Sequence, residues 1–114
     1  MNTQEARMRM RDLAAQAITI TTRLGSGEAA TREHAEHLRA MAVEARGLLA
    51  EAGYPAEAVW RGLQRADIGT QTALGGSDAG YWLDVSDDLT SGMQVLENLV
   101  GSHATRDVDF RIVT

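Results

Sequence analysis

The sequence predicts an all-α protein, an up-down four-helix bundle with a short extended C-terminal tail, in one domain over residues 1–114. Apolar residues recur with a period of 3.6 in four successive segments, which is typical of amphipathic helices. Glycine and proline stand at the breaks between these segments. Aromatic residues make up only 4% of the chain, so small aliphatic residues must fill the interior, which favours closely packed helices over a β-sandwich. Short connections between the helices imply antiparallel neighbours.

A first helix is predicted from about Thr3 to Leu24, with an end at the Gly25-Ser26-Gly27 break. The β-branched run from Ile18 to Thr22 would also suit a short strand. The apolar stripe passes through this run without interruption, and this favours the helix. The members of the stripe are Ala6, Met10, Leu13, Ala14, Ala17, Ile20, Thr21 and Leu24.

The second helix, between Ser26 and Gly53, has the clearest punctuation. Its N-terminal cap is either Ser26 or Thr31, because both hydroxyls can accept a hydrogen bond from the first turn. At the other end Gly53 tolerates a positive φ, and Pro55 cannot continue the helix. Its stripe consists of His34, Leu38, Met41, Ala42, Ala45, Leu48, Leu49 and Ala52.

A third helix is expected to start with Pro55 in its first turn, where the missing N–H costs nothing, and to stop at Gly75-Gly76. Its stripe consists of Ala56, Val59, Leu63, Ala66, Thr70 and Leu74.

A fourth helix lies between Ser77 and Gly101, and Ser77 or Asp78 can cap it. An alternative start at Ser86-Asp87-Asp88 would leave the residues before it as a loop or turn. Its stripe consists of Trp82, Val85, Leu89, Met93, Leu96 and Val100.

The tail, residues 103–114, changes period. From Asp107 onward Val108, Phe110 and Ile112 alternate with charged residues, which predicts a half-buried extended segment. Such a segment packs over the bundle, pairs with a strand not evident from the pattern, or pairs with another chain.

Composition and charge limit the classes of function that this chain can have. Without cysteine no disulfide or thiolate metal site can form, and this is consistent with a cytoplasmic protein. No apolar run approaches the ~20 residues that span a bilayer, and no signal peptide is evident. Residues 1–50 hold seven arginines against six acidic residues, whereas residues 51–114 hold four against ten. The acidic half disfavours nucleic acid as a partner, and the uneven charge would suit head-to-tail or antiparallel self-association.

Glu33-His34-Ala35-Glu36-His37 is the one cluster with the residue types of a metal site. The helical wheel places His34 on the apolar stripe, and Glu33 and His37 on the opposite side. No matching Glu-x-x-His occurs elsewhere, so we expect neither a metal nor another cofactor. His34 is predicted to be a buried, hydrogen-bonded residue near the helix start, or to lie at a partner interface.

Four polar or aromatic residues are candidates for an inter-helix pocket that would bind a small molecule: His34, Trp60, Asp67 and Trp82. Asp67 beside Trp60 would be a ligand-orienting group or a general base. A general base needs a partner, and no second acid, histidine or serine is predictably adjacent. The alternative is that Asp67 pairs with an arginine from a neighbouring helix.

Arg32, Arg39 and Arg46 recur every seven residues and form one ridge of the second helix. With Phe110 of the tail, these are the candidate partner-binding residues, although a solvated ridge would give the same pattern. No catalytic constellation emerges. The sequence therefore favours a non-catalytic protein–protein interaction module, a homodimer or a regulatory or accessory subunit, over a small-molecule-binding protein or a small enzyme.

Overall fold

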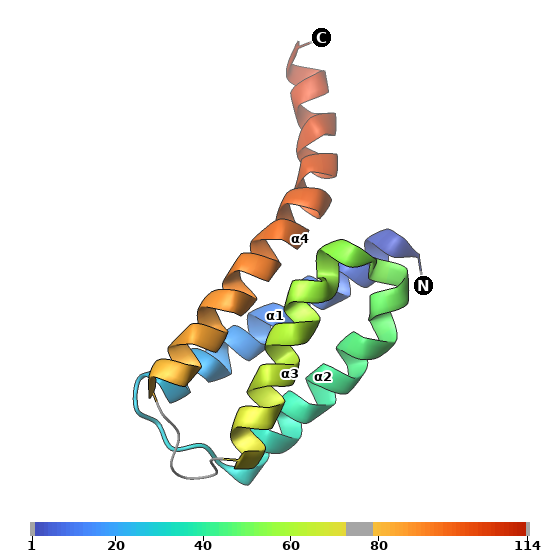
Figure 1. Cartoon of the computed structure of the whole chain (residues 1–114). Helices are drawn as coiled ribbons and strands as arrows, with labels where there is room; N and C mark the ends of the chain where they lie inside the picture. The colour runs from blue at the N-terminus through green and yellow to red at the C-terminus, as the bar shows by residue number, and fades with distance from the viewer. Residues whose placement is uncertain (1, 73–78, 114) are drawn as a thin grey trace.

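The computed structural model is a bundle of four α-helices and confirms the all-α prediction (Figure 1). It describes the backbone of residues 2–72 and 79–113, and the side chains of residues 2–71 and 79–100. The elements, in chain order, are α1 (Thr3–Gly25), α2 (Arg32–Ala52), the short 3-10 helix η1 (Tyr54–Ala56), α3 (Glu57–Thr72) and α4 (Ala79–Val113).

The helices are arranged so that α1 and α3 each pack against both α2 and α4. In Figure 1, α4 and α2 lie on opposite sides, with α3 in front of the bundle and α1 behind it. Successive helices run in opposite directions, as the short connections predict. α1 packs most extensively against α4.

The core is made by the stripes that the periodicity predicts. Alanines without any exposed surface, such as Ala14 and Ala17, alternate along α1 with Met10 and Leu13. Small side chains let neighbouring helices approach closely, which is why so few aromatic residues suffice. Trp82 of α4 is the largest fully buried side chain.

The start of α2 settles the choice between two caps. The Oγ1 of Thr31 accepts a hydrogen bond from the backbone N–H of His34 at 3.1 Å, and the Nδ1 of His34 accepts one from the backbone N–H of Thr31 at 3.3 Å. This reciprocal capping box fixes the first turn, so α2 begins at Arg32. Ser26 instead lies at the end of α1, where its backbone N–H bonds to the carbonyls of the last turn.

The turn between α2 and α3 depends on Gly53, whose φ of 81° is a conformation that favours glycine. Pro55 follows within η1, so the third α-helix begins at Glu57 and not at the proline. Arg7 of α1 holds this turn, because its Nε donates to the carbonyl oxygen of Ala52 at 2.9 Å. The carbonyl of Ala52 has no partner within its own helix, so the arginine satisfies a group that would otherwise need water.

α4 begins at Ala79, so the residues before Ser86 are helical and the alternative start at Ser86-Asp87-Asp88 is wrong. The predicted stop at Gly75-Gly76 and the predicted cap at Ser77 or Asp78 lie outside the described residues.

The extended tail that the alternation predicts is replaced by helix, since α4 continues to Val113. Figure 1 shows its last turns running past the ends of the other helices. A helix bonds its own backbone groups internally, whereas a single strand without a neighbour would leave its N–H and C=O groups unpaired. The side chain of Phe110 lies outside the described residues.

An ion pair joins α1 to α2. The Nε and Nη2 atoms of Arg9 donate to the two carboxylate oxygens of Glu44 at 2.5 and 2.8 Å. The hydrogen bond from Arg9 lowers the pKa of Glu44 below its ordinary value of 4.5, against a smaller opposing effect of desolvation.

We expect Glu44→Gln to lower the free energy of unfolding at pH 7 by less than about 1 kcal/mol, because the two side chains are 41% and 40% exposed and solvent screens the pair. The folded-state pKa of Glu44 lies below the unfolded value, so its contribution is complete above the unfolded pKa and is lost as the pH falls through the folded pKa. Urea unfolding of both proteins from pH 7 into acid should therefore show converging stabilities. A difference that stayed constant down to about pH 2 would contradict the assignment, and Glu36→Gln on the same helix is the control.

Candidate functional site

The aromatic candidates are separated in the structure. Trp82 is completely buried, with its ring edge-to-face on Tyr81 at a centroid distance of 5.3 Å, and its Nε1 has no hydrogen-bond partner among the described residues. Trp60 is half-buried, and the guanidinium of Arg46 from α2 lies 5.9 Å from the centre of its ring. Trp60 therefore contributes to the contact between α2 and α3, and Trp82 to the core.

Asp67 and His34 are occupied by local contacts. Asp67 accepts a hydrogen bond from Nε2 of Gln71, one turn further along α3, at 2.9 Å. None of the ion pairs of the described side chains involves Asp67, so the expected arginine partner is not found there. His34 is only partly buried; it caps α2, and its Nε2 lies 3.5 Å from a carboxylate oxygen of Glu28.

Two hollows on the surface give these residues no common pocket. The larger, of about 510 Å³, lies between α3 and α4 and is lined by none of the four candidates. A second, of about 420 Å³, lies between α1 and α2 and has His34 and His37 in its lining, without Trp60, Asp67 or Trp82. Neither of these two hollows, which are formed by described residues, brings the four predicted ligand-binding residues together.

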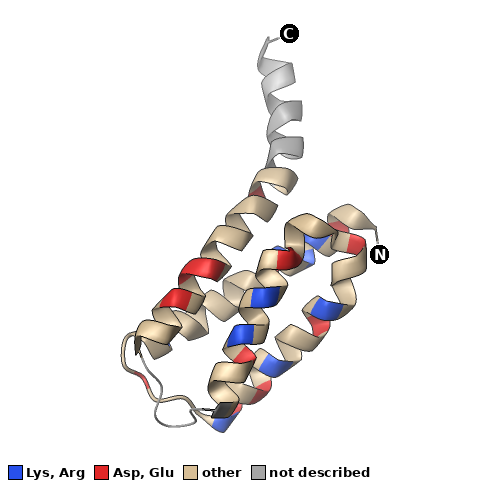
Figure 2. Cartoon of the chain, in the orientation of Figure 1, with Lys and Arg blue, Asp and Glu red and all other residues tan. Residues whose placement is uncertain are grey.

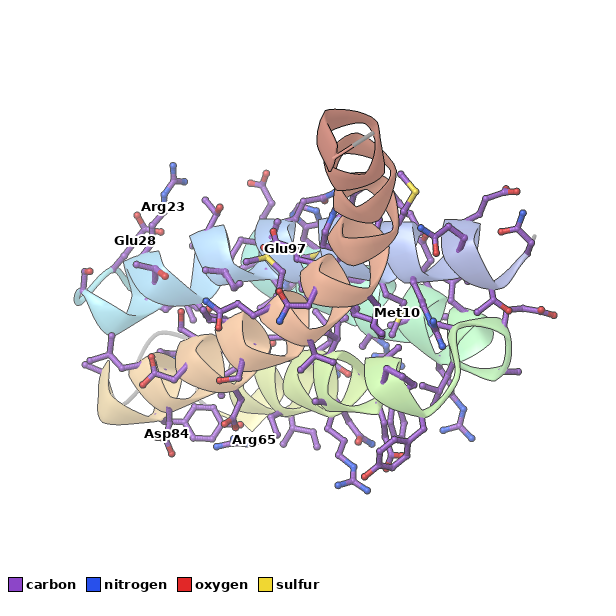
Figure 3. The ribbon with its side chains drawn as sticks, turned by 90° about the horizontal axis from the view of Figure 1, so that it is seen from above. Met10, Arg23, Glu28, Arg65, Asp84 and Glu97 are labelled. Atoms are coloured by element: carbon purple, nitrogen blue, oxygen red, sulfur yellow. The ribbon has the colours of Figure 1, made fainter. Side chains whose placement is uncertain are left out.

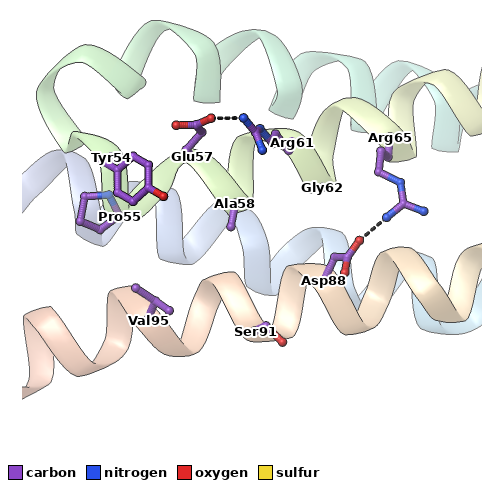
Figure 4. A pocket seen from close by; sticks show the side chains of 10 residues that line it. All are labelled: Tyr54, Pro55, Glu57, Ala58, Arg61, Gly62, Arg65, Asp88, Ser91 and Val95. Atoms are coloured by element: carbon purple, nitrogen blue, oxygen red, sulfur yellow. Dashed lines mark hydrogen bonds and ion pairs between the residues drawn. The ribbon is translucent and has the colours of Figure 1, made fainter.

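The groove between α3 and α4 has an apolar end and a charged end (Figure 4). Tyr54, Pro55 and Val95 form the apolar end, and Tyr54 is 85% exposed. Toward the other end Arg61 pairs with Glu57 one turn before it on α3, and Arg65 pairs with Asp88 across the groove. The charged side chains drawn there face one another in pairs.

Arg65 organises the contact between α3 and α4. Besides its ion pair with Asp88, it lies 3.8 Å from a carboxylate oxygen of Asp84. Its backbone carbonyl accepts a hydrogen bond from the hydroxyl of Tyr81 at 2.5 Å, and its guanidinium lies 5.6 Å from the centre of the same ring. These contacts place Asp84 and Asp88 on the side of α4 that faces α3.

The charged groups of the groove are already paired with one another. Ser91 has no histidine beside it among the lining residues to act as a base. Within the described residues no three histidine, aspartate or glutamate side chains are placed to hold a metal ion.

The groove belongs to a wider surface, which we call the α2–α3–α4 face. Asp84 and Asp88 of α4 form one edge. The contacts of both aspartates with Arg65 of α3 place this edge beside α3. Ile68 lies near the middle; it is 50% exposed and projects from the side of α3 opposite its buried stripe. The other edge is the arginine ridge of α2, and the contact of Arg46 with Trp60 places that ridge beside α3. The ridge residues are Arg32, Arg39 and Arg46.

Charged residues are distributed unevenly over this face: Figure 2 shows acidic residues on α4, and arginines interspersed with acidic residues on α2. Asp84 and Asp88 are the acidic side chains of α4 whose contacts with Arg65 place them on this face, and residues 79–100 contain no arginine. On the opposite edge Arg32 and Arg39 are exposed and form no ion pair with any described side chain. One edge, which we call the acidic edge, therefore presents Asp84 and Asp88, and the other, which we call the basic edge, presents Arg32 and Arg39, with the exposed Ile68 between them.

Sequence reasoning identified the arginine ridge but missed Ile68, Tyr54 and the acidic edge as parts of one surface. A large apolar residue outside a helical stripe was the available signal for Ile68.

Comparison of the chain with protein-family models, with curated proteins and with solved structures found no match. Within the described part of the chain, none of the helices combines the length and the hydrophobicity that a membrane-crossing segment needs.

Proposed function

We propose that this chain is a non-catalytic protein–protein interaction module that associates with a second copy of itself. The observation that carries the proposal is the α2–α3–α4 face, where an acidic and a basic edge flank the exposed Ile68. A surface with both charges is complementary to another copy of itself, and complementary charge guides association and fixes register.

A binding role is also supported by the ion pairs that the charged side chains of the groove form with one another. The carboxylates and guanidinium groups of the groove satisfy one another. The exposed apolar side chains, by contrast, gain from removal of water at an interface. Tyr54, Ile68 and Val95 are among the exposed large apolar residues on this side of the bundle.

Self-association is tested by the mass of the full chain in solution. The mass from light scattering or sedimentation should rise above the monomer value of 12.3 kDa as the concentration increases. It should fall toward that value as salt is added, because salt screens the charges of the two edges. A mass of one copy at every concentration and salt level would refute the proposal.

A second candidate function is the binding of a small amphipathic molecule, and the groove of about 510 Å³ favours it. The apolar end formed by Tyr54, Pro55 and Val95 suits a short alkyl chain, and Arg61, which stays 68% exposed in its pair with Glu57, could also donate to a ligand carboxylate. Octanoate is a suitable probe: if it binds, the melting temperature should rise once its concentration exceeds the dissociation constant. Val95→Asp should abolish the rise. No shift with octanoate, or an equal shift in the variant, would dismiss the groove as its site.

A further inference from the structure

We infer that the second copy docks on the α2–α3–α4 face through a twofold axis that runs parallel to α3, so that α2 of each copy lies over α4 of the other. The inference rests on the proposed self-association and specifies its surface and symmetry.

The order of the helices across the face gives this symmetry. α4, α3 and α2 follow one another from edge to edge, with α3 in the middle (Figure 1). When a second copy is rotated by 180° about an axis along α3 in the plane of contact, its left and right edges exchange. The acidic edge of each copy then meets the basic edge of the other, and α3 meets α3. The two contacts are identical, as twofold interfaces require.

The heights of the charged residues agree with this arrangement. α2 and α4 both begin at the same end of the bundle. Arg39 follows the start of α2 at Arg32 by seven residues, and Asp84 and Asp88 follow the start of α4 at Ala79 by five and nine. At a rise of about 1.5 Å per residue, Arg39 lies about 10 Å along its helix and the two aspartates about 7 and 13 Å along theirs. Because rotation about an axis parallel to α3 preserves height, Arg39 of one copy lies level with both aspartates of the other.

Within one copy, the charged residues of the two edges are not fully paired, so they can form ion pairs with a second copy. Arg39 has no ion-pair partner among the described side chains. Asp84 contacts Arg65 only at 3.8 Å, and its side chain is 76% exposed. At the middle of the face, Ile68 of each copy would cover the same residue of the other and remove apolar surface from water at the axis.

The opposite side of the bundle supplies a matched control. Arg23 of α1 is exposed and, like Arg39, has no ion-pair partner among the described side chains. Figure 3 shows Arg23 pointing away from the side on which Arg65 and Asp84 lie. Arg23→Glu therefore makes the same charge change as Arg39→Glu outside the proposed interface.

The first test is charge reversal, read out as the dissociation constant of the full chain by sedimentation. Arg39→Glu and Asp84→Arg should each weaken self-association at least about tenfold, because each replaces attraction by repulsion in both symmetric contacts. The double variant Arg39→Glu/Asp84→Arg should regain most of the affinity. Arg23→Glu should leave it within about twofold, since a charge outside the interface acts only through the screened field of the whole protein. Asp84→Asn, which puts no second cation beside Arg65, should weaken association in the same direction as Asp84→Arg.

The second test uses the absence of cysteine from the chain, which makes a single introduced thiol a specific reporter. In Ile68→Cys the two thiols would meet at the twofold axis and form an interchain disulfide under mild oxidation, since a disulfide requires Cα atoms within about 7 Å. Thr19→Cys, on an exposed position of α1 outside the proposed interface, should form no interchain disulfide under the same conditions.

The outcomes separate the two claims. Three results would overturn the twofold arrangement if the natural chain still self-associates: no rescue in the double variant, no disulfide in Ile68→Cys, or a mass above two copies. Each of them would leave the proposed function standing. A chain that is monomeric at every concentration would overturn both.

Discussion

Trp82→Ala is expected to lower the free energy of unfolding by about 3 to 5 kcal/mol, the largest effect of any single truncation in this chain. The indole has no exposed surface and packs against Tyr81 and against the backbone of α3 at Gly69. Its removal would leave a cavity that the surrounding rigid helices cannot fill. Chemical denaturation followed by circular dichroism measures the loss.

Trp82→Phe is the matched control. Because Nε1 of Trp82 has no hydrogen-bond partner among the described residues, the phenyl ring gives up no hydrogen bond and should retain more than half of the stability lost by alanine. Equal losses for phenylalanine and alanine would show that Nε1 has a partner in solution. Trp60→Ala, at a half-buried position between α2 and α3, should cost less than Trp82→Ala.

Two glycine-to-alanine substitutions in helix interiors are expected to act in opposite directions. At Gly69 of α3 an added methyl group would lie 2.5 Å from the ring of Tyr81 and 2.9 Å from that of Trp82. Flat rings packed in a core cannot yield without moving α4, so Gly69→Ala should destabilise the protein by about 1 to 3 kcal/mol. At Gly47 of α2 the added methyl group would meet no atom within 4 Å. Gly47→Ala should therefore stabilise by about 0.5 to 1 kcal/mol through helix propensity alone.

The same thermal or chemical unfolding experiment measures both glycine variants. Stabilisation by Gly69→Ala would show that α3 and α4 lie further apart than the structure places them. An unchanged stability for Gly47→Ala would instead mean that the end of α2 is already frayed in solution.

The individual helices were largely predictable because each depends on local chemistry. The stripe of α1 passes through the β-branched run at Ile18, and the structure keeps that run helical. Thr31 was one of two candidate caps, and its reciprocal bonds with His34 decided between them. The alternation at the C-terminus was misleading because a period of two over a few residues indicates a strand only if another strand is present to pair with it.

The candidate face was only half predictable. Helical periodicity shows that Arg32 and Arg39 share a ridge, and that Asp84 and Asp88 lie off the core stripe. It does not show which helix stands beside which, so the pairing of Arg65 with the acidic edge could not be anticipated. For the same reason the grouping of His34 with Trp60, Asp67 and Trp82 in one pocket stays a prediction, although neither of the two hollows described above is lined by all four residues.

The extensive packing of α1 against α4 has a consequence for how the chain is made. The ribosome makes α4 after α1, α2 and α3, so the part of the α1 stripe that α4 covers stays exposed until α4 has emerged. Joining two segments so far apart in sequence requires closure of a long loop, which slows folding relative to bundles whose contacts are mostly between successive helices. Apolar surface that is exposed during synthesis favours aggregation, so the nascent chain is more vulnerable before α4 emerges than after it.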